Sequence, residues 1–282
     1  MNMKILKYIL SVLILTAFVS CEKNVIEYNT TPISDVAEFQ LHYFVPVTAV
    51  AANNIYKVVV NDQLYANEKA PLATYNAIPN GAVGKFYRAP IGSQTIKLYQ
   101  GQGATEKLVY EQPCNFVKGK QNVFVYDFAK PPVVFDNGYP YTTNVTENTD
   151  STCWVKFYNF LYETDGVYTD LKLQYQYVDP RTKELKNVGQ PIAFGETTGW
   201  VPVKVVKTDF NSAGSCRIDY KVKVVDASGA ITGDLGIMNS KGVYVPYADY
   251  WTEFIGRRYH HVISGMRSSK AITAATRQFT AL

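Results

Sequence analysis

The side chains best suited to catalysis or metal binding in this sequence are three histidines, His42, His260 and His261. His260 and His261 are adjacent, so a strand would point them to opposite faces and they could not hold one metal ion together. No histidines or cysteines have the spacing of a zinc site. Alternation along the first strand places His42 outward with Gln40. We therefore expect surface or half-buried histidines, no metal and no cofactor.

Two further patterns could suggest enzymatic chemistry. The glycine-rich segment 101–107 lies between the strand-like runs 96–99 and 107–110, whereas a phosphate-binding loop needs a helix N-terminus. It predicts a hairpin turn instead. No Gly-x-Ser-x-Gly elbow is present. Asp249 and Glu253 could in principle pair as in a two-carboxylate glycosidase, but nothing in their spacing favours it. The sequence thus predicts a protein that is not an enzyme.

Three cysteines follow Cys21 in the sequence. They are Cys114, Cys153 and Cys216. Alternation places Cys153 on one face with Val155, and Cys216 also on the inner face of its strand. Both then point into the core of a second domain. They could form a disulfide between two sheets in an oxidising compartment. Equally, each could be a buried thiol that packs as a small hydrophobe, as we expect for Cys114.

Aromatic residues make up 14% of the chain and supply the remaining candidate site. Two clusters fall where strands are expected to end, one at Trp200 and one within 244–251. Loop-borne Trp and Tyr beside a carboxylate can stack on sugar rings and bind their hydroxyls. The predicted ligand-binding residues are Trp200, Tyr247, Asp249, Tyr250 and Trp251. The alternative is that Trp251 fills the core beneath its loop.

Composition limits the class of protein. Only 18% of the residues are charged, below the roughly 25% of ordinary domains. This excludes a disordered chain and a Lys/Glu-rich coiled coil. The formal net charge is +4, and no cluster of Lys or Arg predicts a nucleic-acid partner.

Hydrophobic residues alternate with a period of two along most of the chain. The clearest example is 216–224, where Cys216, Ile218 and Tyr220 share one face while Arg217 and Asp219 share the other. Such alternation is typical of antiparallel strands with one buried face. Frequent turn signals between the short strands predict an all-β fold of two tandem Ig-like antiparallel β-sandwiches.

A polar, proline-bearing segment divides the chain. Residues 131–151 carry Pro131-Pro132 and a run of Asn and Thr. A structureless stretch of about twenty residues is uncommon inside one compact domain. We interpret it as a linker between a first β-sandwich domain at 35–130 and a second at 152–282.

The N-terminus indicates export. Lys4 and Lys7 precede the apolar run 8–19, which is shorter than the ~20 residues that span a bilayer as a helix. Residues 1–20 therefore read as a signal peptide. Without them, and without Lys4 and Lys7, the net charge falls from +4 to about +2.

Phe18-Val19-Ser20-Cys21 resembles a bacterial lipobox, which implies cleavage before Cys21 and acylation of its thiol. The alternative is a simple secreted protein with an incidental cysteine. The loose lipobox and the following Glu22-Lys23-Asn24 are similar to lipoproteins of the Bacteroidetes. The resemblance implies an outer-membrane lipoprotein on the periplasmic or cell-surface face, with residues 21–34 as its tether. Asp150-Ser151-Thr152 resembles the O-glycosylation site of exported proteins in that group, with Ser151 as acceptor.

The two halves of the chain contain matching segments. Residues 41–45 can be laid on 155–159, 55–60 on 170–175, and 119–125 on 256–262, which suggests a tandem duplication. This order of segments resembles the domain of unknown function 4397, which occurs as tandem Ig-like pairs in exported bacterial proteins. The resemblance implies the fold and brings no catalytic residues.

Together these patterns predict a non-enzymatic lipoprotein of the cell envelope that acts as a binding or adhesion module. Its partners would be the membrane, through the lipid anchor, and glycans or envelope proteins. The alternative is a structural subunit of a surface assembly, similar to the fimbrillins of the Bacteroidetes.

Overall fold

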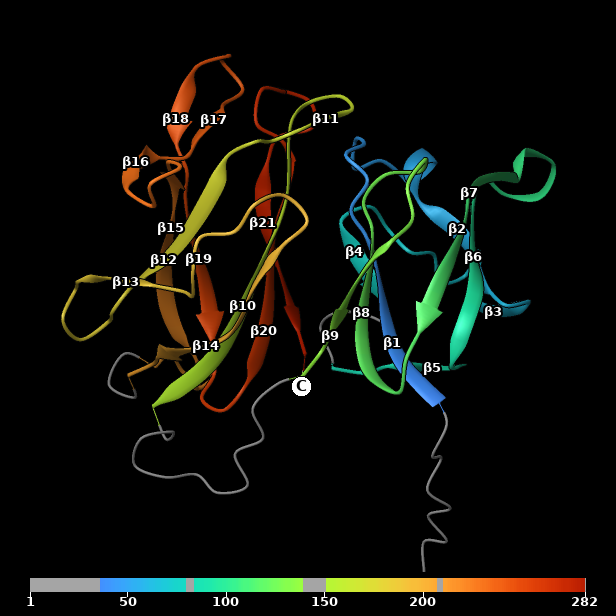
Figure 1. Ribbon diagram of the computed structural model, residues 1–282, viewed down its shortest axis with the longest axis horizontal. Helices are drawn as coiled ribbons and strands as arrows, with labels where there is room; N and C mark the ends of the chain where they lie inside the picture. The colour runs from blue at the N-terminus through green and yellow to red at the C-terminus, as the bar shows by residue number, and fades with distance from the viewer. Residues whose placement is uncertain (1–35, 80–83, 139–150, 207–209, 282) are drawn as a thin grey trace, which may run out of the picture. The chain divides into compact units, whose positions relative to one another are not determined.

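The computed structural model describes residues 36–79, 84–138, 151–206 and 210–281. The predicted signal peptide, Cys21 and the tether lie outside these residues. Within them the chain forms β-strands and two short 3-10 helices, η1 (Ala51–Asn53) and η2 (Gly103–Thr105) (Figure 1). The all-β prediction is confirmed. None of the helices in the described ranges is long and apolar enough to cross a membrane.

Residues 36–138, here called the first half, form two sheets. One has the order β4-β1-β8-β9, with β5 also pairing with β1, and the other has the order β3-β2-β6-β7. β1 and β8 are parallel, and the other pairs are antiparallel. The strands are β1 (Val36–Tyr43), β2 (Ile55–Val60), β3 (Gln63–Ala66), β4 (Asn76–Ile78), β5 (Tyr87–Pro90), β6 (Gly92–Gln100), β7 (Lys107–Phe116), β8 (Gly119–Val125) and β9 (Val133–Asp136). The β6–β7 hairpin confirms the turn predicted for 101–107.

Residues 151–281, the second half, form two larger sheets and a hairpin. The sheets have the orders β11-β10-β20-β21, with β14 on β10, and β13-β12-β15-β16, with β19 on β15; β17 pairs with β18. Only β10 and β20 are parallel among these pairs. The strands are β10 (Thr152–Thr164), β11 (Val167–Tyr168), β12 (Lys172–Val178), β13 (Leu185–Asn187), β14 (Thr197–Lys204), β15 (Cys216–Val225), β16 (Ile231–Asp234), β17 (Gly236–Met238), β18 (Tyr244–Pro246), β19 (Ala248–Glu253), β20 (Arg258–Met266) and β21 (Ala275–Thr280).

The two halves share a strand connectivity. In each, the first strand pairs in parallel with the penultimate one, β1 with β8 and β10 with β20. In each, an early strand, β2 or β12, is in the opposite sheet, and the last strand flanks the penultimate one. The segments matched in the sequence fall on these equivalent strands, which agrees with the tandem-duplication hypothesis.

Each half has a hydrophobic core between its two sheets. In the first half Phe39 and Val123 meet Val58 and Leu98 from the opposite sheet, and all four side chains are buried. The second core contains residues from β10, β12, β15 and β20. On β15 the predicted alternation is observed, with buried and exposed positions in turn from Cys216 to Tyr220.

A third buried cluster joins the halves, and we call it the junction. It is made of Phe44, Ala77 and Phe124 from the first half and of Tyr158, Phe160, Val262 and Phe279 from the second. The Phe124 ring stacks on Phe160 with centroids 4.9 Å apart and lies 5.0 Å from Tyr158. Residues 35–282 form one compact unit. Because of the junction, β1 and β10 are buried on both faces over most of their length.

The structure overturns the prediction of surface or half-buried histidines, because the junction covers His42 and His260 and the core of the second half encloses His261. His42, His260 and His261 are all completely buried. His42 does share a face with Gln40, as alternation required, but that face contacts the second half instead of water. The His42 ring stacks on Phe124 and lies 6.2 Å from His260.

The range predicted as a linker begins with structure. β9 lies inside 131–151 and pairs with β8. Lys156 is buried, and its Nζ donates a hydrogen bond to the carbonyl of Asp136 at the end of β9. Residues 139–150 of this range lie outside the described residues.

Candidate functional site

Three of the four aromatic residues predicted to bind ligands lie within strands, and only Tyr247 lies in a connection, between β18 and β19. β18 and β19 cover most of 244–253. Along β19, Asp249 and Trp251 are half-buried while Tyr250 is 51% exposed. The Tyr247 hydroxyl lies 2.9 Å from both Asp249 Oδ2 and Thr276 Oγ1. Tyr247 and Asp249 therefore bind each other within the fold.

Trp200 belongs to a different sheet from β19, which carries Asp249, Tyr250 and Trp251. It lies on β14, its indole Nε1 donates to the carbonyl of Asn137, and its ring is 5.1 Å from His260. Trp251 instead packs against the core of the second half, as the alternative interpretation required. Tyr250 faces outward with the Arg217 guanidinium 3.8 Å above its ring. The five residues do not form one surface.

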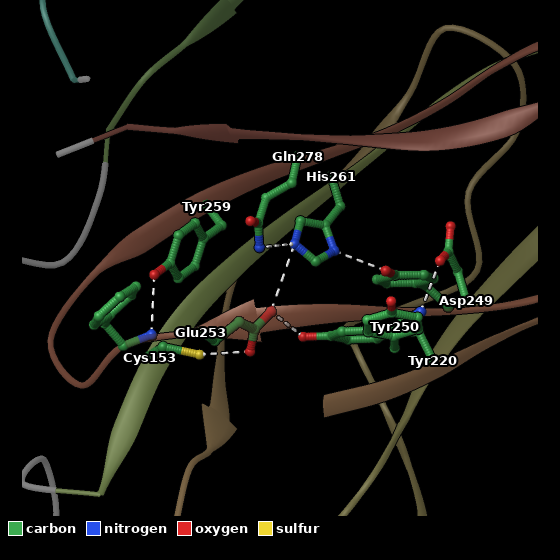
Figure 2. Close-up of polar contacts among 10 residues, drawn as sticks. Cys153, Tyr220, Asp249, Tyr250, Glu253, Tyr259, His261 and Gln278 are labelled. Atoms are coloured by element: carbon green, nitrogen blue, oxygen red, sulfur yellow. Dashed lines mark hydrogen bonds and ion pairs between the residues drawn. The ribbon is translucent and has the colours of Figure 1, made fainter. Parts of the chain in front are cut away.

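A polar cluster that sequence reasoning missed lies inside the second sandwich (Figure 2). Its centre is the Glu253 carboxyl on β19. Cys153 Sγ, on β10, donates to Glu253 Oε2 at 3.0 Å, and the Tyr220 hydroxyl, on β15, donates to Oε1. His261 Nε2, on β20, lies 3.5 Å from the same Oε1. Four strands from both sheets thus meet at one carboxyl group.

The hydrogen bonds of His261 indicate its protonation. The Gln278 amide nitrogen can only donate and lies 3.0 Å from Nε2, so Nε2 is the acceptor. The proton is then on Nδ1, which lies 2.7 Å from the Tyr175 hydroxyl. Burial lowers the pKa of His261 to about 3 and raises the pKa of Glu253 to about 7. Although the two groups are close, both are neutral between about pH 3 and pH 7.

This cluster contains residue types that serve in nucleophilic catalysis, but solvent and substrates cannot reach them. Cys153, Glu253 and His261 have no exposed surface. Burial, the Glu253 carboxyl and its hydrogen bond together raise the pKa of the Cys153 thiol, which opposes formation of a reactive thiolate. The arrangement is that of a buried polar network, whose satisfied members fix how the two sheets pair.

The three cysteines of the described ranges are buried free thiols. Cys153 and Cys216 both belong to the core of the second half, as alternation predicted. Cys216 lies directly opposite Glu253 in the β15–β19 register, so both cysteines are beside the same carboxyl.

A solvent-open pocket of about 280 Å³ lies where the two halves meet. It is lined by residues 45–47, which follow β1, by residues 126–129, which follow β8, and by Tyr162, Asp165 and Gly166 of the β10–β11 hairpin. Its volume is close to the lower end, about 300 Å³, of small-molecule sites. No sequence signal marked it, because its three segments are far apart in the chain.

The junction pocket combines apolar walls with two carboxylates. Phe128 and Tyr126 are half-buried, and Asp165 is exposed at the hairpin tip. Asp127 accepts hydrogen bonds from the Tyr168 hydroxyl at 2.7 Å and from a backbone N–H at 2.8 Å. Within the described parts of the chain, no three His, Cys, Asp or Glu side chains are placed to hold a metal ion.

Two predicted modification sites remain predictions. Ser151 is half-buried in the turn before β10, and its carbonyl accepts a hydrogen bond from Val205. Asp150 of the same motif, like Cys21, lies outside the described residues.

Comparisons with known proteins identify no family. No family model and no curated protein match the chain. Among solved structures it is similar to "The Bacillus anthracis TIE protein", with 9% identity and a TM-score of 0.21 over 83% of this chain and 34% of that one. It is also similar to a "putative adhesin from Bacteroides ovatus", with 11% identity and a TM-score of 0.18 over 86% and 93% of the two chains. The chain spans about a third of the first protein, and TM-scores this low assign it no function.

Proposed function

We propose that this protein is a non-enzymatic lipoprotein of the cell envelope that acts as a binding or adhesion module for glycans or envelope proteins. Acyl groups on Cys21 hold it on the outer membrane. The observation that supports the binding role is the junction pocket, where three chain segments from both halves bring aromatic rings and carboxylates to an open surface.

The pocket is a better candidate than either alternative site. The Glu253 cluster is closed to solvent, so no substrate reaches it. The aromatic residues of 244–251 and Trp200 are divided among three sheets. Binding sites commonly lie on loops that a rigid β-scaffold positions, and residues 45–47 and 126–129 are such loops, following the parallel strands β1 and β8.

Replacing Cys21 by alanine should release the protein from the membrane. Acyl chains contribute about 0.8 kcal/mol per buried CH₂, and without them the chain has no lipid group to anchor it. Cell fractionation should find the wild type with the membranes and Cys21→Ala in the soluble fraction. Ser151→Ala, which leaves the lipobox intact, is the matched control and should stay with the membranes. Equal partitioning of wild type and Cys21→Ala would contradict the anchor.

Binding should depend on the junction pocket. The detergent-solubilised lipoprotein is applied to arrays of glycans and of purified envelope proteins. Phe128→Ala removes a pocket wall and should weaken the captured interaction at least ~10-fold, the effect of a contributing aromatic contact. Tyr250→Ala, at an exposed aromatic outside the pocket, should change it little. Absence of any binding to the arrays would refute the proposed binding function. Loss of binding in Tyr250→Ala alone would place the binding site on β19.

The structural-subunit alternative has one observation in its favour. β21 is the last strand, lies at a sheet edge, and pairs only with β20 among the described strands. Its Phe279 is buried in the junction, so exchange of β21 between copies would open a long apolar groove. A monomeric mass at all concentrations, with β21 amides protected from hydrogen exchange, would leave only the binding proposal.

A further inference from the structure

The junction pocket carries negative charge without a compensating cation in its lining. Asp127 and Asp165 are its only ionisable side chains apart from two tyrosines. Neither aspartate takes part in any ion pair among residues that the structure describes. Burial and the Asp127 charge both raise the pKa of Tyr126, in keeping with a local excess of negative charge. A cationic group is the complement of such a pocket.

The walls of the pocket suit an aliphatic stem that ends in a cation. Val45, Pro46 and Val47 provide apolar surface on one side, and the rings of Tyr126 and Phe128 line another part. Aromatic faces attract ammonium and guanidinium groups, and apolar walls cover the methylene stem of Lys or Arg. An anionic ligand would meet two uncompensated carboxylates.

A neighbouring strand edge favours a polypeptide as the source of that cation. β11 is the outermost strand of its sheet, and its pairing partner among the described strands is β10. Val167, on β11, is 51% exposed, and it follows Asp165 and Gly166 of the pocket lining. Main-chain groups at a free edge can pair with an extended peptide while a pocket receives one of its side chains.

We infer that the junction pocket receives an arginine or lysine side chain of a partner polypeptide that lies along β11. The inference rests on the proposed binding function and names the chemistry of its ligand. The cation lies between Asp127 and Asp165, the stem lies against the apolar wall, and the partner's backbone follows the edge of β11.

The test is an NMR titration of the full, detergent-solubilised chain with N-acetyl-Gly-Arg-Gly-amide. The matched probe replaces arginine by citrulline, which has the same shape and no charge. The arginine peptide should shift the amides of 126–129 and 165–168 saturably, and citrulline should bind at least ~10-fold more weakly, a usual difference for a charge-assisted contact. Raising the salt concentration from 0.05 to 0.5 M should weaken binding of the arginine peptide, because salt screens a partly exposed contact between charges.

Variants at Asp165 distinguish an effect of its charge on binding from an effect on the stability of the fold. Asp165 has an exposed side chain in a turn before Gly166, where asparagine is well tolerated. Asp165→Asn should weaken binding of the arginine peptide about 5-fold or more and leave the melting temperature unchanged. Asp165→Glu should keep most of the wild-type affinity. Asp127→Asn should also weaken binding of the arginine peptide.

Three results would overturn the inference: equal affinity for the arginine and citrulline peptides, no effect of Asp165→Asn, or shifts confined to residues outside the pocket. A neutral glycan that binds the array through Phe128 without any arginine preference would refute this ligand while leaving the proposed binding function intact. Conversely, peptide binding without any array partner would leave the pocket chemistry standing and refute the module.

Discussion

Replacing Phe124 by alanine should lower the free energy of unfolding by about 3–5 kcal/mol, the usual cost of a buried phenylalanine. The ring is completely buried and lies at the centre of the junction. It stacks on His42 at 4.3 Å within the first half and on Phe160 at 4.9 Å across the junction. Truncation therefore leaves a cavity that both halves line. Urea unfolding followed by tyrosine fluorescence and circular dichroism measures the change.

The matched variants for this prediction differ in how much volume they remove. Phe124→Leu keeps part of the packing and should cost less than alanine. Tyr250→Ala truncates a ring that is 51% exposed and should stay within ~0.5 kcal/mol of wild type. A loss below ~1 kcal/mol in Phe124→Ala would show that the junction contributes little to stability.

Acid should destabilise the protein strongly between pH 6.5 and 4. Burial lowers the pKa of His42 to about 4 and of His261 to about 3, and it lowers the pKa of His260 as well. The unfolded chain binds protons at these histidines below pH 6.5, whereas the folded chain does not until much lower pH. The contribution of these histidines to stability is therefore complete above pH 6.5 and is lost as the pH falls.

Glu253 acts in the opposite direction over the same range. Burial raises its pKa to about 7, so the folded chain binds this proton before the unfolded chain does. Stability from this group rises as the pH falls from 7 to 4.5, by about 3 kcal/mol at 1.36 kcal/mol per pKa unit. The shifts of His42 and His261 are of similar or larger size and together outweigh it, so these three groups give a net loss on the order of 3 kcal/mol from pH 6.5 to 4, and burial of His260 acts in the same direction.

Two substitutions distinguish the contributions in unfolding measured as a function of pH. His42→Gln removes one titrating group at the junction and should flatten the loss below pH 6.5. Glu253→Gln removes the opposing group and should steepen it, while gaining stability relative to wild type as the pH rises from 5 to 7.5. A free energy of unfolding that is constant between pH 6.5 and 4.5 would contradict the buried, neutral state of the histidines.

Local patterns in the sequence were sufficient for the strands. The alternation from Cys216 to Val224 predicted one buried and one exposed face, and the structure has them from Cys216 to Tyr220. Gly101 and Gly103, both with positive φ, mark the β6–β7 turn that their spacing indicated. Matching segments in the two halves fall on strands with equivalent connections. These features depend on residues close together in the chain, so a single sequence contains them.

The candidate site could not be predicted in the same way. From the sequence, we expect Tyr247, Asp249 and Trp251 where a strand ends, on a loop. In fact β19 contains Asp249 and Trp251, Tyr247 directly precedes it, and contacts with Thr276 and the core turn Tyr247 and Trp251 inward. The pocket combines residues about 80 and 120 positions apart in the sequence, and no local pattern connects such distant segments.

The sequence by itself determined the class of fold, its strands and their inner faces, because side-chain periodicity follows directly from strand geometry. Only the tertiary structure decided what covers the outer face of β1. Periodicity divides a strand into two faces but does not say whether water or another sheet meets the second one. For His42, Phe44 and Phe124 it is another sheet. That packing buries His42 and His260 and, at its rim, forms the junction pocket, whereas His261 is buried inside the second sandwich.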